Sequence, residues 1–260
     1  MIADIHNKIS RNASNLSDRL EDNLTGNFFG ALRYLPYNTG LKQIFVKSVY
    51  PKELAQAIEK IDCQFWDSNI IFWPYDEEGE IDALLEFPNS IIGIEVKLFS
   101  GLSSDDGISN GENFPPQQEW ETIHSMNQLA RESRIVSRLG NGKEKLLLFI
   151  APDPECTMIY QDTLDRKILS SDVQFGAISW QDILASLRDI KMSTPYEQLV
   201  LTDLIRLLIS KGFEKFRSFE LDMEIEIDLL KAYLFQKNAF NFADAAKEKK
   251  VKGDMFYEFR

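Results

Sequence analysis

Two apolar runs joined by a short turn constrain the fold of this chain more than any other feature. Residues 81–87 and 91–98 read IDALLEF and IIGIEVKL, and the turn sequence PNS separates them. Apolar runs of this length, bounded by turn formers, predict two antiparallel strands. We name this unit the charged hairpin, because Asp82, Glu95 and Lys97 interrupt its apolar runs.

The rest of the chain mixes helical periodicity with further short apolar runs. This mixture predicts an α/β fold in which helices flank a mixed central sheet on both faces. The predicted helices span 14–35, 51–62, 117–139, 180–190 and 196–211. The predicted strands outside the charged hairpin span 43–50, 69–74, 145–151 and 173–179.

Domain organisation is predicted from length and from two polar stretches. The 260 residues suffice for one large domain or two small ones. The polar stretch KMSTPYE favours a boundary that divides a domain of residues 1–192 from a helical extension of residues 193–260, packed on the same domain. Residues 100–116 carry no periodic pattern. A substrate loop and a plain surface loop both fit them.

Composition narrows the class of protein. The net charge of −12 excludes a general polyanion binder, so any contact with a nucleic acid requires a local basic patch. The longest apolar run, LLLFIA, is far too short for a membrane span, and the polar start lacks the apolar core of a signal peptide. We therefore predict a cytoplasmic protein without a membrane partner.

The charged residues of the hairpin predict a metal site. Alternation along a strand puts Glu95 and Lys97 on one face and Val96 on the other. If Asp82 pairs nearby, its carboxylate and that of Glu95 repel each other, and a hard cation such as Mg²⁺ removes that conflict. The alternative is an edge hairpin that carries a surface salt bridge.

These residues resemble the motif of the PD-(D/E)xK nuclease superfamily, whose fold is restriction-endonuclease-like. Asp82 and the triplet Glu95-Val96-Lys97 match it across twelve intervening positions, although Ile81 stands where the motif has proline. The resemblance covers about residues 15–190. It implies metal-dependent hydrolysis of phosphodiester bonds, most often in DNA.

The resemblance also implies roles for single residues. Lys97 would position the attacking water or stabilise the transition state, and Gln128 on a later helix would contact the water or a phosphate. For Gln128 an ordinary surface position is the alternative, and for Glu21 an exposed place in the first helical turn. The implied ligands of Mg²⁺, for which Mn²⁺ could substitute, are Asp82, Glu95, the carbonyl of Val96 and Glu21.

The most basic window of this acidic chain follows Gln128. Between residues 131 and 145 it predicts a surface that contacts phosphates, with an ordinary charged helix face as the alternative. Its candidate residues are Arg131, Arg134, Arg138 and Lys143.

Together these features predict a Mg²⁺-dependent endonuclease acting on DNA. The alternative is a catalytically silent nucleic-acid-binding or adaptor subunit with the same fold. The complete set of Asp82, Glu95 and Lys97 favours the enzyme, and the acidic net charge favours the adaptor. A homodimer and a partner protein are both left open.

Overall fold

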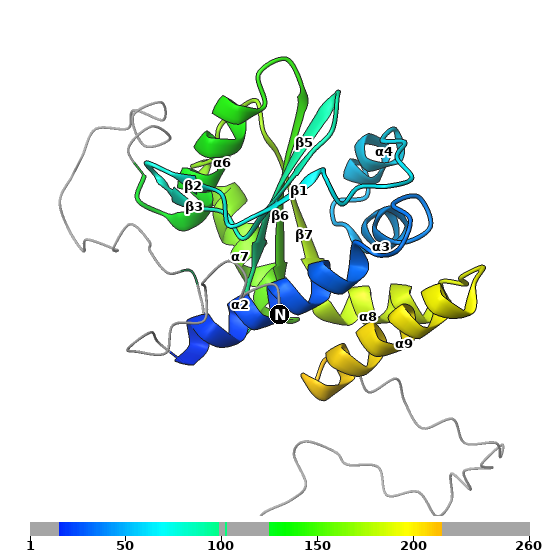
Figure 1. The fold of residues 1–260 in the computed structure, drawn as a ribbon. Helices are drawn as coiled ribbons and strands as arrows, with labels where there is room; N and C mark the ends of the chain where they lie inside the picture. The colour runs from blue at the N-terminus through cyan, green and yellow to red at the C-terminus, as the bar shows by residue number, and fades with distance from the viewer. Residues whose placement is uncertain (1–15, 99–101, 103–124, 215–260) are drawn as a thin grey trace, which may run out of the picture. The chain divides into compact units, whose positions relative to one another are not determined.

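A computed structural model describes residues 16–98, 102 and 125–214 of the chain (Figure 1). The chain divides into two compact units, residues 1–215 and residues 216–260. The second unit lies outside the described residues, as do residues 117–124 of the predicted helix and the predicted loop 100–116 apart from Leu102. The first unit extends past the boundary predicted near residue 192, because it includes the helix α9 (Pro195–Ser210).

A five-stranded mixed sheet forms the centre of the first unit. Its first three strands are antiparallel, and β6 and β7 continue from β5 in parallel. Ala83 pairs with Ile94 and Glu86 with Ile91, so the charged hairpin is confirmed as a strand pair. The strands, in their order across the sheet, are β1 (Ile70–Phe72), β4 (Ala83–Glu86), β5 (Ser90–Val96), β6 (Glu144–Ala151) and β7 (Gln174–Ser179).

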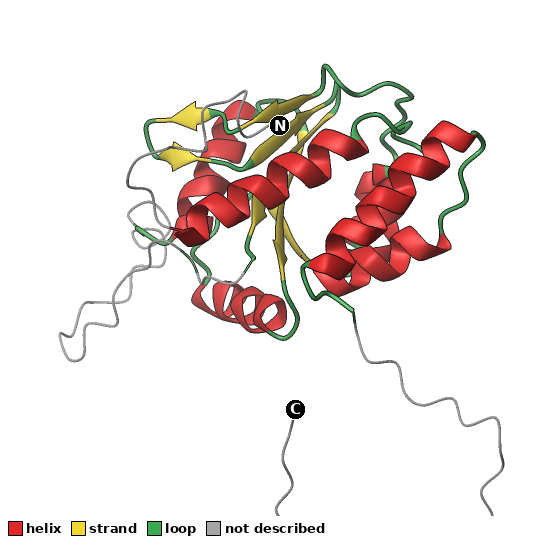
Figure 2. Ribbon diagram, turned by 60° about the horizontal axis from the view of Figure 1, so that its bottom comes forward, coloured by secondary structure: helices red, strands yellow, loops and turns green. Residues whose placement is uncertain are grey.

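Helices cover both faces of this sheet, as predicted (Figures 1 and 2). Strand alternation divides the core in two: Leu148 of β6 joins one apolar cluster, and its neighbour Phe149 joins the other. The helices α6 (Gln128–Leu139) and α7 (Glu155–Arg166) pack in the cluster of Phe149. The cluster of Leu148 contains residues of α2 (Leu16–Leu32), α3 (Leu41–Ser48), α4 (Leu54–Glu59), α8 (Trp180–Asp189) and α9.

The strand predicted over residues 43–50 is wrong, because this segment forms most of helix α3. Its buried residues Leu41, Ile44, Phe45 and Ser48 follow helical spacing. Only Tyr50, beyond the helix, makes an isolated bridge, with Ala177 of β7. Helix α7 was not predicted at all.

Two local features set the position of α6. The side chain of Asn127 accepts hydrogen bonds from the backbone N–H groups of Leu129 and Ala130, which caps the helix and starts it later than predicted. Gly93 of β5 allows close approach, because a Cβ there would lie 2.5 Å from Cγ2 of Val136. As a result, α6 lies close against the middle of the charged hairpin.

A small ribbon of two strands, absent from the predicted strands, precedes the charged hairpin. It consists of β2 (Tyr75–Asp76) and β3 (Gly79–Glu80), and we name residues 75–80 the acidic hairpin. In the described part of the chain, none of the helices combines the length and apolar character that crossing a membrane requires.

Candidate active site

Glu95 and Lys97 lie at the end of β5, on the face of the sheet that α6 covers. Both are buried, with 2% and 5% of the residue exposed. The Nζ atom of Lys97 lies 2.8 Å from Oε1 of Glu95. The Lys97 backbone is held on both sides: its N–H donates to the carbonyl of Ile150, and its carbonyl accepts from Nε1 of Trp180. The pair therefore has a fixed place at the end of the strand.

Asp82 lies next to this pair, directly before β4. The pairing of Ala83 with Ile94 brings Asp82 beside Glu95. Oδ2 of Asp82 accepts a hydrogen bond of 2.8 Å from the backbone N–H of Val96. The Asp82 residue is half-buried, and the Val96 side chain points into the apolar core on the other face. The three residues predicted from the charged hairpin thus share one region.

Glu21 reaches this region from helix α2. Its Oε2 lies 3.4 Å from Nζ of Lys97, and its Oε1 accepts a hydrogen bond from the backbone N–H of Leu98. Glu21 is buried, so the alternative of an exposed first-turn glutamate is wrong.

Gln128 enters the same region from the first turn of α6. Its Nε2 donates to Oε1 of Glu95 over 2.5 Å, and the residue is buried. The alternative of an ordinary surface glutamine is therefore wrong. Oε1 of Glu95 is in contact with both Lys97 and Gln128, which links elements far apart in the sequence.

The sequence reasoning missed a further acid, Glu132. It lies one turn after Gln128, is 2% exposed, and neither of its carboxylate oxygens receives a hydrogen bond from a donor in the described structure. A signal existed: Glu132 interrupts an apolar stripe that contains Leu129 and Val136. We name Glu21, Asp82, Glu95, Lys97 and Glu132 the carboxylate centre.

Burial and mutual repulsion shift the pKa values of this centre. Burial raises the pKa of Glu95 well above its ordinary value, and the charge of Glu132 adds to this. Burial likewise raises the pKa of Asp82, with the charge of Glu95 as the next cause. The pKa of Glu132 rises to about 8, mainly because of burial.

Lys97 shows the opposite balance. Burial lowers the pKa of Lys97, but Glu95 and Glu21 outweigh burial and raise it above its ordinary value. Lys97 is therefore held as an ammonium ion. Among the five described residues of the centre, one ammonium ion faces four acidic side chains, so a proton or a cation would relieve the repulsion between the carboxylates.

A preformed metal site is absent from the described residues. Among the described residues, no group of three or more acids, histidines or cysteines is arranged to hold a metal ion. The carboxylate oxygens of the centre nevertheless suit a hard cation. Both Glu132 oxygens accept no hydrogen bond in the described structure, so they are available to such an ion. Asp82, Glu95 and Glu132 could hold such an ion after a local rearrangement of their side chains.

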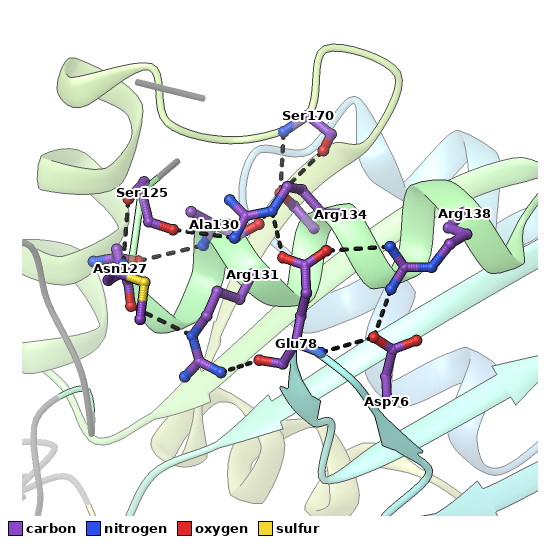
Figure 3. A network of polar contacts seen from close by, with 11 residues as sticks. Asp76, Glu78, Ser125, Asn127, Ala130, Arg131, Arg134, Arg138 and Ser170 are labelled. Atoms are coloured by element: carbon purple, nitrogen blue, oxygen red, sulfur yellow. Dashed lines mark hydrogen bonds and ion pairs between the residues drawn. The ribbon is translucent and has the colours of Figure 1, made fainter. Parts of the chain in front are cut away.

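The arginines of the predicted basic window lie next to the acidic hairpin and not in the carboxylate centre (Figure 3). Arg131, Arg134 and Arg138 form one row along α6, which we name the arginine stripe, and all three contact the acidic hairpin. Lys143 does not join them. It pairs over 2.7 Å with Glu86, at the end of β4 farther from Asp82.

Comparisons with known proteins add no family to this description. No family model matches the chain, and neither a curated protein nor a solved structure matches it.

Proposed function

We propose that this chain is a metal-dependent nuclease with a restriction-endonuclease-like fold, which hydrolyses phosphodiester bonds in DNA. The observation that carries the proposal is the convergence of Asp82, Glu95 and Lys97 in one region, with Glu21 and Gln128 joining from two helices. An antiparallel charged hairpin followed by two parallel strands also supports the proposed fold.

The chain's own residues divide the work. Asp82 and Glu95 would hold a Mg²⁺ ion, with Glu132, Glu21 and the carbonyl of Val96 as further oxygen donors. When bound, the ion neutralises charge on the phosphate and lowers the pKa of a coordinated water. Lys97 would hold the attacking water or a phosphate oxygen by its compact charge, and Gln128 would orient the carboxylate of Glu95.

A cleavage assay tests this proposal. Supercoiled plasmid, linear duplex DNA, single-stranded DNA and RNA are each incubated with the full chain and Mg²⁺, with chelator as the control. We expect Mg²⁺-dependent cleavage of DNA, and a rate lower by about 10²–10⁴-fold in Lys97→Ala. Lys60→Ala serves as the matched variant, because Lys60 is exposed and its ion pair with Glu144 is long, at 4.0 Å.

The outcomes separate the possibilities. Full cleavage by Lys97→Ala would show that the site is wrong, and equal losses in both lysine variants would show a general charge effect. Preferential cleavage of RNA would correct the substrate and leave the site intact.

One observation favours a second function. Lys97 contacts both Glu95 and Glu21, and the described residues show no preformed group of three metal ligands. A catalytically silent nucleic-acid-binding or adaptor subunit could keep such a closed arrangement permanently. Salt-dependent binding of a nucleic acid, without Mg²⁺ affinity and without cleavage, would support that function.

A further inference from the structure

The arginine stripe is occupied by two acids of the acidic hairpin (Figure 3). Arg134 Nε lies 2.5 Å from Glu78 Oε2, and Arg138 Nη1 lies 3.1 Å from Glu78 Oε1. Arg138 also reaches Oδ1 of Asp76 over 2.5 Å. Arg131 donates from Nη1 to the backbone carbonyl of Glu78. The Glu78 carboxylate thus accepts from two guanidinium groups at once.

The guanidinium groups that hold these acids are also groups that bind phosphates. Guanidinium groups donate two parallel hydrogen bonds to carboxylate and to phosphate oxygens with similar geometry. Three arginines spaced over two helical turns can also contact more than one phosphate of a strand. The acids of the hairpin therefore stand where phosphate oxygens of a bound strand would fit.

The contact can open without loss of the core. Each strand of the acidic hairpin has two residues, and an isolated ribbon of this size has little stability of its own. The Arg138 side chain is 50% exposed, so water and salt screen its ion pairs. Gly79 permits the close contact with Arg131, because a Cβ at this position would collide with Nη1.

The location connects the stripe to the carboxylate centre. Gln128 and Glu132 lie on the same helix as the three arginines, and Asp82 follows the acidic hairpin after a single residue. A strand of nucleic acid bound along the stripe would pass beside the proposed site of hydrolysis.

We propose that the arginine stripe binds the phosphate backbone of a nucleic acid, and that Asp76 and Glu78 are its intramolecular competitors, displaced when the strand binds. This inference rests on the proposed function for its choice of partner. It goes further by assigning the acidic hairpin a role in controlling access to the site.

Equilibrium binding in the presence of chelator tests the inference without requiring cleavage. Fluorescence anisotropy is measured with labelled duplex DNA, single-stranded DNA and RNA on the wild-type chain and on the double variant Asp76→Asn/Glu78→Gln. We expect the double variant to bind about 5–10-fold more tightly, because the competing charges are gone. Arg138→Gln should weaken binding and reduce the salt dependence by about one phosphate contact.

A matched variant removes the effect of net charge. Asp189→Asn/Asp203→Asn loses the same two negative charges from α8 and α9, where both acids are exposed and lie 3.9 and 4.0 Å from their basic partners. Its affinity should stay within about twofold of the wild type. Thermal melting of every variant checks that it is folded.

The inference is overturned if Asp76→Asn/Glu78→Gln binds no more tightly than Asp189→Asn/Asp203→Asn. Unchanged binding by a folded Arg138→Gln variant would also overturn it, as would tighter binding of polyglutamate than of any oligonucleotide. If the chain never cleaves, yet the double variant still binds more tightly, the nuclease proposal fails and the assignment of the stripe stands.

Discussion

Helix α6 borders two charged clusters that differ in burial and in the way their charges are compensated. Toward the sheet it contributes Glu132 to the carboxylate centre and Gln128 beside it, and both residues are buried. Toward the acidic hairpin it presents the arginine stripe, where the side chains that form ion pairs are between 17% and 50% exposed. One helix thus separates a buried acidic cluster from a partly exposed cluster of three arginines and two acids.

The two clusters also differ in whether each acid has a basic partner, and this difference is more informative than the difference in burial. In the stripe every acid has an arginine partner, so that cluster is complete without a ligand. In the centre Lys97 pairs with Glu95 and Glu21, and the described structure gives the oxygens of Glu132 no hydrogen-bond donor. Folding buries these acids at a cost in free energy, which their raised pKa values express and which is typical of functional sites.

The largest expected effect is on stability when the centre loses Lys97, the one basic residue among its five members. Lys97→Met removes the ammonium ion that pairs with the buried Glu95 and Glu21 and should lower the free energy of unfolding by about 3–5 kcal/mol near pH 8. Lys143→Met removes an ion pair of nearly the same length, 2.7 Å, from the surface. It should cost less than about 1 kcal/mol. Urea unfolding measures both, and equal losses would remove the distinction between the clusters.

The next effect is a dependence of stability on pH. The folded state raises the pKa of Glu132 from 4.5 to about 8. The contribution of Glu132 to the free energy of unfolding is therefore fully present below about pH 4.5 and is lost as pH rises through about 8. In chelator, the free energy of unfolding should fall by about 4 kcal/mol between about pH 5 and about pH 9.

Glu132→Gln should flatten this dependence, whereas Glu59→Gln, at an exposed position, should leave it unchanged. Urea unfolding across the pH range measures the slope for each variant. A slope in Glu132→Gln equal to that of the wild type would place the titrating groups elsewhere.

The sequence predicted most of the sheet, because the charged hairpin combines clear apolar runs with an unambiguous turn. It failed for α3, whose apolar residues fit a short strand and a helix alike; packing against the rest of the core decided the outcome. Helix α7 was missed, because its residues carry no strong periodic signal.

For the site, the sequence exposed the acids that stand out against an apolar strand. Glu132 was hidden, because its neighbours Arg131 and Arg134 make the segment look like a solvated helix face. Its burial depends on how closely Gly93 allows α6 to approach, which is a tertiary contact. The occupation of the arginine stripe was equally hidden, because Asp76 and Glu78 precede the arginines by more than fifty residues.

A smaller effect is expected from Mg²⁺ itself. With a dissociation constant of about 1 mM, about 10 mM Mg²⁺ stabilises the folded state by about 1.4 kcal/mol, or about 3–6 °C in melting temperature. Asp82→Asn should abolish most of this shift, and Asp76→Asn, in the other cluster, should keep it. Differential scanning fluorimetry measures both, and an equal shift in Asp82→Asn would remove the metal from the carboxylate centre.

The smallest effect is expected in the stripe, where salt should decide the result. Arg138→Gln removes two half-exposed ion pairs and should lower the free energy of unfolding by less than about 1 kcal/mol at low salt. The loss should disappear near 1 M salt, where the screening length falls to about 3 Å. The loss from Lys97→Met should persist there, because the surrounding protein excludes the salt from the buried centre. Urea unfolding at both salt concentrations separates the two, and a salt-resistant loss in Arg138→Gln would show that the acidic hairpin is part of the rigid structure rather than a screened surface contact.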